Sequence, residues 1–187
     1  MKKFLLVFAS VFGGLLVVAG MVLFLWISFR NDLIRQRENV DAEWSQVENQ
    51  LKRRADLIPN LVNTVKGFAA HEAGVLASVA EARARLGGGG SVAERAKVEN
   101  ELSSALSRLL IVVENYPNLK ADQNFRQLSD ELAGTENRIA VARRTYNETV
   151  RSYNTKIKQF PGSLFGMTPC EYFEIAEADK VVPKVEF

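Results

Sequence analysis

The sequence contains very few of the residues that metal sites and most hydrolytic active sites require. Among its 187 residues there is one cysteine, Cys170, and one histidine, His71. A single cysteine excludes an internal disulfide and a zinc site built from a cysteine cluster, and a single histidine excludes metal sites with two histidine ligands. We therefore expect no metal or other cofactor, no set of catalytic residues and no enzymatic activity.

Charge of one sign is not in excess either. The chain has 24 Lys and Arg residues against 22 Asp and Glu residues, and it is neutral once Lys2 and Lys3 are set aside. Nucleic-acid binding needs a concentrated basic face, so we expect no nucleic-acid partner. The basic run Lys52-Arg53-Arg54 would cover about 300° of a helix. We interpret this run as a solvated face with local ion pairs, and contact with phosphates or an acidic partner is the alternative.

One long apolar stretch stands near the N-terminus. Residues 4–29 carry no charge. As a helix, these 26 residues would extend about 39 Å, which exceeds the roughly 30 Å hydrocarbon core of a bilayer. A cleaved signal peptide is the alternative, but the apolar core of a signal peptide has only about 7 to 15 residues. We predict a single transmembrane helix at residues 4–29, after a short flank at residues 1–3, with the lipid bilayer as its partner.

The flanks of this stretch bear on its surroundings and its orientation. Trp26, Phe29 and Arg30 are the kinds of residue that lie at a membrane interface. Basic residues flank both ends in similar number, so the positive-inside rule does not decide the orientation. Small residues four apart, at Ala9 and Gly13, would let two helices approach closely. We interpret them as ordinary membrane-helix composition, with self-association as the alternative.

From residue 30 to residue 160, apolar residues recur three or four positions apart, which predicts long amphipathic helices. The first would continue directly from the transmembrane helix, because no helix breaker separates them. Pro59 lacks a backbone donor and crowds the carbonyl of Ala55, so we expect a kink or a short break there. The apolar positions before and after it are Leu33, Val40, Trp44, Val47, Leu51, Ile58, Leu61, Val62, Val65, Phe68, Leu76 and Val79.

Turn and capping residues divide the rest of this region. The four glycines Gly87–Gly90 predict a loop, and Ser91 with Glu94 predicts a capping box at the start of a third helix. A fourth helix would be ended by Pro161-Gly162. Its apolar stripe comprises Phe125, Leu128, Leu132, Thr135, Ile139, Ala142, Tyr146, Val150, Tyr153, Ile157 and Phe160. Short connections favour antiparallel neighbours, so we predict an all-α protein in which an antiparallel up-and-down helical bundle occupies residues 30–160.

The composition changes once more over residues 161–187. Four apolar residues lie close to the end of this segment, at Val181, Val182, Val185 and Phe187. These are too many apolar groups for a solvated tail, because their burial is favourable. We expect residues 161–187 to dock on the bundle, and binding to a neighbouring chain is the alternative.

Polar residues that could form a site are scattered along the chain. His71-Glu72 is the only histidine–acid pair, and we interpret it as a surface or capping pair, with proton transfer as the alternative. Carboxylates stand near phenols in two places, Glu114 with Tyr116 and Glu148 with Tyr146. Nothing in their spacing predicts that these two groups meet.

Three asparagines and the cysteine have structural interpretations. Asn60, Asn63 and Asn154 lie on or beside the apolar stripes, where a buried amide needs hydrogen-bond partners and can fix the register of helices. Cys170 has no nearby histidine, and its apolar surroundings predict an inert thiol.

Several longer motifs identify a family resemblance. They are VDAEWS (residues 40–45), QLKRRADLIPNLV (50–62), VKGFAAHE (65–72), ENYPNLK (114–120), ENRI (136–139), ARRTYN (142–147), YN (153–154), FP (160–161) and VEF (185–187). Together they resemble the LemA family of bacterial membrane proteins, in order and over essentially the whole chain. The four-glycine turn departs from the family pattern as a local variation in loop length.

The resemblance implies a single-pass protein of the bacterial inner membrane whose soluble part is an up-and-down helical bundle. It implies an N-terminus outside the cell and a bundle in the cytoplasm. The family has no catalytic residue set that could be carried over to this chain. Family genes often accompany a membrane metalloprotease of the envelope stress response, which suggests a partner.

Our main hypothesis is a non-enzymatic, membrane-anchored helical scaffold or interaction protein with an unidentified protein partner. The joint around Pro59 would position the bundle relative to the membrane. The alternative is a single-span sensor or receptor that binds a small ligand between helices, in a pocket lined by Asn60, Asn63 and Tyr146. A tight pair of carboxylates, or a contact between a tyrosine and the histidine, would instead favour an enzyme.

Overall fold

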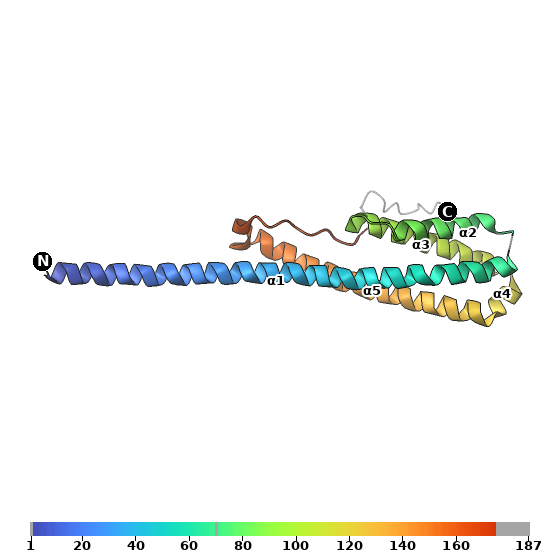
Figure 1. Cartoon of the computed structure of the whole chain (residues 1–187), viewed down its shortest axis with the longest axis horizontal. Helices are drawn as coiled ribbons and strands as arrows, with labels where there is room; N and C mark the ends of the chain where they lie inside the picture. Colours follow the sequence, from blue (N-terminus) through green and yellow to red (C-terminus); the bar gives the residue numbers. More distant parts are fainter. Residues whose placement is uncertain (1, 70, 175–187) are drawn as a thin grey trace, which may run out of the picture.

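The computed structural model describes residues 2–69 and 71–174, with side chains from Phe12 onward. Within these residues all regular structure is helical, which confirms the predicted all-α class. The elements are α1 (Lys2–Phe68), α2 (Ala73–Leu86), α3 (Val92–Val113), α4 (Pro117–Ala121), α5 (Gln123–Lys158) and the 3-10 helix η1 (Gly162–Phe165). The long helices α1, α2, α3 and α5 form an up-and-down bundle, beyond which α1 projects toward the N-terminus (Figure 1).

Helix α1 is one continuous helix of 67 residues, about 100 Å long at 1.5 Å per residue. Its described part contains an apolar window with a mean hydropathy of 2.3, and none of that window is buried inside the protein. The exposed apolar side chains there are Phe12, Leu15, Leu16, Val17, Val18, Met21, Val22, Leu23, Phe24, Leu25, Trp26 and Ile27. By length and composition this part of α1 can cross a bilayer, which supports the expected transmembrane helix.

The core lies between the bundle halves of α1 and α5 and the α2–α3 hairpin (Figure 1). Most of the predicted stripe positions are buried, and Trp44 packs against Tyr146 with ring centroids 5.3 Å apart. The buried stripe residues of α1 are Leu33, Val40, Val47, Leu51, Ile58, Leu61 and Val65. Phe160, the last position of the predicted fourth stripe, lies instead on the exposed surface because α5 ends at Lys158.

Pro59 does not interrupt α1, so the expected short break is wrong. In a helix without proline, the carbonyl of Ala55 would accept a hydrogen bond from the amide of residue 59. Here the Arg83 side chain of α2 donates to that carbonyl, with Nε and O 3.0 Å apart. The replacement donor removes part of the cost of proline in a helix interior, and α1 continues to Phe68.

Side chains at the helix starts fix where α3 and α5 begin. The Ser91 hydroxyl accepts from the Glu94 amide at 3.2 Å, and the Glu94 carboxylate accepts from the Ser91 amide at 2.8 Å. This arrangement is the predicted capping box. Asp122 caps α5 in a similar way, because its carboxylate accepts from the Phe125 amide at 2.9 Å. Helix α4 was not expected from the sequence.

Beyond α5 the chain reverses and runs back along the bundle. The turn requires glycine at Gly162, because a Cβ atom there would overlap the Lys156 carbonyl. Phe173 is fully buried and packs against Trp44 at 5.8 Å between ring centroids. The expected docking of residues 161–187 stays a prediction beyond Glu174, because the apolar residues near the C-terminus lie outside the described residues.

Candidate functional site

An ion cluster inside the bundle joins three helices. Arg54 of α1 and Glu99 of α3 are both buried, with 5% and 6% of their surface exposed. The Arg54 guanidinium pairs with Glu99 and with Glu136 of α5, and it donates to the Ser103 hydroxyl at 3.1 Å. One cation therefore connects α1 to both α3 and α5, at a point where these helices are otherwise packed through apolar residues.

Burial changes the protonation of this cluster. Desolvation raises the pKa of Glu99 from its ordinary value of 4.5 to about 7, although the Arg54 guanidinium opposes the change. The Glu136 carboxylate adds to the rise, because two negative charges repel. Among the described residues, Glu99 Oε2 and Arg54 Nε have no hydrogen-bond partner. The cluster can therefore gain or lose a proton near neutral pH.

The interpretation of Lys52-Arg53-Arg54 as a solvated face is wrong for Arg54. Lys52 and Arg53 are exposed, as expected. Arg54 stands three residues after Leu51 and four before Ile58, so it shares the buried face of α1 with them. The position of Arg54 in the apolar stripe was the signal that its side chain is buried. A buried cation requires an anionic partner, so this position also indicated an ion pair with another element.

An apolar groove of about 360 Å³ opens beside the ion cluster, between α1, α3 and α5. Arg54 and Glu136 belong to its lining. The remaining lining residues are Leu61, Ser103, Leu106, Ser107, Leu110, Ser129, Leu132 and Ala133. The groove therefore combines an apolar surface with one buried cation, a combination that suits a ligand with an apolar body and few polar groups.

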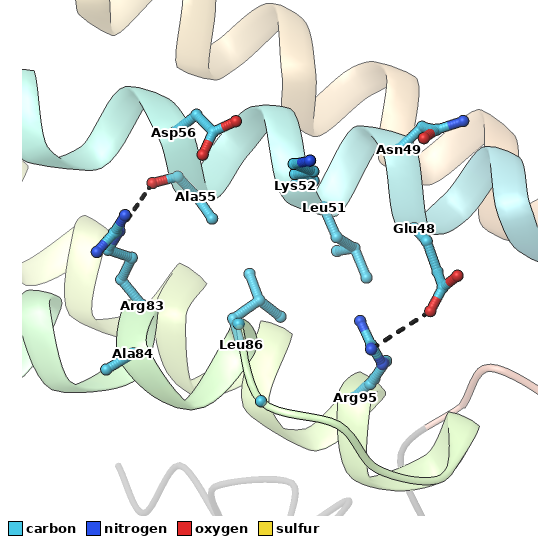
Figure 2. A pocket seen from close by; sticks show the side chains of 12 residues that line it. Glu48, Asn49, Leu51, Lys52, Ala55, Asp56, Arg83, Ala84, Leu86 and Arg95 are labelled. Carbon is cyan, nitrogen blue, oxygen red and sulfur yellow. Dashed lines mark hydrogen bonds and ion pairs between the residues drawn. The ribbon is translucent and has the colours of Figure 1, made fainter.

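A second groove, of about 700 Å³, separates α1 from the α2–α3 hairpin (Figure 2). Two contacts join its sides: Arg95 pairs with Glu48 at 3.3 Å, and Arg83 donates to the Ala55 carbonyl at 3.0 Å. The apolar side chains drawn between these contacts belong to Leu51 and Leu86. The contacts hold the hairpin against the part of α1 that contains Pro59, so this groove is a structural junction.

The histidine–acid pair does not form a unit. His71 is exposed, whereas the Glu72 carboxylate accepts a hydrogen bond from the Tyr116 hydroxyl at 3.2 Å. Desolvation and the neighbouring Glu72 carboxylate raise the pKa of Tyr116, which keeps the phenol protonated. This contact connects the start of α2 to the α3–α4 turn. A contact between the histidine and a tyrosine would have favoured an enzyme. Among the described contacts, His71 makes none with a tyrosine.

The other carboxylates near phenols pair with basic residues. Glu114 pairs with Lys120 at 2.5 Å, and Glu148 pairs with Arg144 at 3.0 Å, both on the surface. The Tyr146 hydroxyl instead donates to the Glu171 carbonyl at 2.8 Å. Burial raises the pKa of Tyr146 to about 12. The structure therefore does not bring these two carboxylates and phenols into one acid–base site.

The three asparagines have different surroundings. Asn60 and Asn63 are exposed on α1, and only Asn154 is buried. Trp44 packs on Tyr146, and Asn60 lies sixteen positions farther along α1, about 24 Å away. The pocket expected from Asn60, Asn63 and Tyr146 is therefore not formed, and the groove beside Arg54 is the candidate ligand site instead.

Asn154 anchors the C-terminal segment to α5 through its amide group. Its Nδ2 donates to the Cys170 carbonyl at 2.9 Å, and its Oδ1 accepts from the Cys170 amide at 2.8 Å. Asn147 makes the same pair of bonds with Phe173, at 3.3 Å and 2.9 Å. The two asparagines are seven positions apart on one face of α5, and they fix the register of the segment against that helix.

Cys170 is a buried free thiol. Burial raises its pKa, although the Arg37 guanidinium that contacts Sγ opposes the rise. A raised pKa keeps the thiol protonated and weakly nucleophilic at neutral pH. Its surroundings are less apolar than expected, because Arg37 and Tyr153 lie beside it. Within the described residues, no three His, Cys, Asp or Glu side chains gather in a group that could hold a metal.

Comparison with known proteins decides the family. The family model described as LemA family matches residues 43–187. The chain belongs to the LemA family. The resemblance seen in the motifs is thereby confirmed. This LemA-family chain is similar to Protein LemA of Metamycoplasma hominis, with 26% identity over 147 residues that cover 78% of this chain and 67% of that protein.

Two magnetosome proteins are similar to this LemA-family chain as well. Magnetosome protein MamQ 1 of Paramagnetospirillum magneticum is 25% identical over 174 residues, covering 77% of this chain and 64% of the relative. Magnetosome protein MamQ of Magnetospirillum gryphiswaldense is 24% identical over 173 residues, covering 76% and 64% respectively. The chain thus spans just under two thirds of the length of these magnetosome relatives.

Proposed function

We propose that this LemA-family protein is a non-enzymatic scaffold that α1 anchors in the bacterial inner membrane and that presents its bundle to a protein partner. The observation that carries the proposal is the continuity of α1. The helix that exposes apolar side chains from Phe12 to Ile27 also supplies core residues from Leu33 to Val65. An uninterrupted helix transmits the position of its membrane-embedded part to the bundle.

The polar contacts of the bundle support a structural role for its charged residues. Arg54 connects α1 to α3 and α5, Arg83 satisfies the Ala55 carbonyl, and Arg95 pairs with Glu48 across the second groove. Glu99 and Glu136 are two neighbouring carboxylates, as in a catalytic pair, but both pair with the Arg54 guanidinium. Each of these groups is engaged between helices, which favours a scaffold over an enzyme.

The proposed scaffold needs a protein partner that its bundle can contact. Family resemblance suggests a membrane metalloprotease of the stress response, and self-association is the other possibility. The bundle exposes Ile111 near the end of α3 and Val141 in the middle of α5. These positions report on partners without disturbing the core, because each side chain already faces solvent.

Photocrosslinking in cells tests the scaffold. The photoreactive residue benzoylphenylalanine replaces Ile111 or Val141, and adducts are identified by mass spectrometry. We expect a defined protein adduct from at least one bundle position. The matched control carries the same residue at Val17, in the apolar part of α1. Adducts from neither bundle position, in cells where the protein is intact and membrane-bound, would contradict a scaffold with a stable partner.

The orientation is a second part of the proposal. We infer from the family resemblance that the bundle lies in the cytoplasm and the N-terminus outside. Ser152 is exposed on α5, so Ser152→Cys in a Cys170→Ser background gives a single accessible thiol. A membrane-impermeant maleimide should label this thiol only after spheroplasts are lysed. Labelling of intact spheroplasts would place the bundle outside and overturn this part.

A receptor is the second candidate, and the groove beside Arg54 favours it. The apolar lining and the buried guanidinium could hold an amphiphilic metabolite. A thermal-shift screen of the full chain in detergent detects such a ligand. Ser107→Trp is the matched variant. Ser107 lines the groove, so the larger side chain fills part of it, and Ser107 is exposed, so the bundle core is not disturbed. A ligand that stabilises the wild type but not this variant would support the receptor; stabilisation of both would place binding elsewhere.

A further inference from the structure

The loop that follows α5 exposes large apolar side chains. Phe160 has 82% of its surface exposed and Leu164 has 58%. The chain turns tightly at Gly162, which is buried against the last turns of α5, and η1 holds Leu164 outward. Two large apolar groups within five residues are costly in water, because each keeps apolar surface hydrated. We call residues 160–167 the end loop.

Contacts with α1 place the end loop at a defined position along that helix. The Phe165 ring packs on Trp26 at 4.4 Å and on Phe29 at 5.8 Å between centroids. Trp26 and Phe29 close the uncharged stretch of α1. Figure 1 shows the end loop beside α1 at the point where that helix leaves the bundle. The loop therefore lies level with the end of the membrane-spanning part of α1.

Basic residues surround the same level of the molecule. Lys156 pairs with Asp32 and lies 5.8 Å from the centre of the Phe29 ring. Arg30 and Lys158 are exposed nearby, one at the end of the apolar stretch and one at the end of α5. Aromatic and apolar side chains combined with exposed cations are typical of segments that lie in a bilayer interface, with cations at the level of the lipid phosphates.

We propose that the end loop inserts Phe160 and Leu164 into the interface of the bilayer that α1 crosses. This inference rests on the proposed membrane anchor. It adds a second membrane contact at the end of α5, so that the bundle touches the bilayer at two elements. With α1 alone the bundle could tilt freely with its helix, whereas two contacts fix the angle between the bundle and the membrane. The bilayer is the occupant we favour because Phe165, the neighbour of Leu164, packs on Trp26 at the end of the exposed apolar part of α1.

Tryptophan fluorescence in brominated lipid vesicles tests the insertion, because bromine on an acyl chain quenches only an indole in contact with the lipid. The full chain has two tryptophans, so Trp26→Phe and Trp44→Phe provide a background without them. Phe160→Trp and Leu164→Trp then report separately on the end loop. Both replacements are at exposed positions, and circular dichroism verifies that the bundle is folded. We expect a blue-shifted emission from both, and loss of emission in lipids brominated near the carbonyl end of the chains.

Two further single-tryptophan variants separate this inference from the proposed anchor. Val17→Trp lies in the apolar part of α1, and Ile111→Trp lies at the opposite end of the bundle. We expect quenching at position 17 and none at position 111. No quenching at position 17 would overturn the anchor itself. Quenching at position 17 but at neither loop position would leave the anchor in place and overturn the insertion of the end loop.

Two other results would also contradict the insertion. Quenching at position 111 together with the loop positions would mean that the whole bundle lies flat on the vesicle. A blue shift at Phe160→Trp without quenching, increasing with the ratio of protein to lipid, would show that the loop is covered by a second copy of the chain.

Discussion

At the scale of single residues, Glu99 links the stability of the bundle to pH. Because burial raises its pKa to about 7 from an ordinary 4.5, the folded state binds the proton more tightly than the unfolded state. The stabilisation is complete below the unfolded pKa and is lost as the pH rises through the folded pKa. The stability of the bundle should therefore decrease between about pH 4.5 and about pH 7. Arg54 lessens this loss without removing it.

Glu99→Gln should remove this dependence on pH. Across this pH range, the free energy of unfolding of the wild type should fall relative to that of the variant by on the order of 3 kcal/mol. Urea unfolding of the full chain in detergent micelles, followed by circular dichroism, measures the difference. Glu101→Gln is the control, a partly exposed carboxylate on the same helix that pairs with Arg85. A difference between wild type and Glu99→Gln that does not vary with pH would contradict the account.

Asn154 should contribute more to stability than the other asparagines of the apolar stripes. Asn154→Ala leaves the Cys170 amide and carbonyl without partners, which we expect to cost about 2 to 4 kcal/mol. It should also speed modification of the Cys170 thiol by a maleimide, because the segment that contains this cysteine is released from α5. Asn63→Ala, an exposed asparagine on α1, is the control and should change neither quantity. Equal thiol reactivity in both variants would argue against the role of Asn154.

Residue patterns were a good guide to which positions are buried. They were a poor guide to which polar groups contact each other. The apolar stripe located Leu51 and Ile58, and the position of Arg54 between them was visible in the same pattern. Its partners could not be found in this way, because Glu99 and Glu136 lie on other helices and nothing local specifies a contact between elements. The candidate site is therefore a product of tertiary packing.

At the scale of elements, the junction of α1 and α2 depends on one unusual hydrogen bond. Proline removes the donor for the Ala55 carbonyl, and Arg83 replaces it from α2. Proline does remove a hydrogen-bond donor from a helix interior, as expected. The replacement donor, Arg83, is 28 positions from Ala55 in the sequence, so the local pattern could not predict it. The capping box at Ser91 was predictable because all of its atoms come from four consecutive residues.

A double-mutant cycle tests this junction. Arg83→Ala should destabilise the protein by about 1 to 2 kcal/mol, because the Ala55 carbonyl loses its donor. In a Pro59→Ala background the new amide serves that carbonyl, so the same substitution should cost less, with a coupling energy of about 1 kcal/mol. Urea unfolding of the four proteins gives both values. Additive effects would show that Arg83 does not compensate for Pro59.

At the scale of the whole molecule, the protein is a rod whose two halves share one helix. The part of α1 from Phe12 to Ile27 is apolar and exposed, and the part from Leu33 to Val65 supplies residues of the bundle core. The sequence predicted both parts, and the absence of a helix breaker between them was the one indication that they form a single helix. The end of α5 and the end loop pack beside α1 at the junction. This packing should prevent the bundle from moving as a body suspended on a flexible linker.

Hydrogen exchange of the full chain in lipid nanodiscs tests this continuity most directly. Amides from residue 12 to residue 40 should exchange slowly without interruption, because those in the bilayer and those in the bundle belong to one hydrogen-bonded helix. The decisive peptide covers residues 27–35, at the membrane surface. Protection there equal to that of the bundle core would support a rigid anchored scaffold. Exchange there at the rate of an unstructured chain would show a flexible hinge and contradict the central claim.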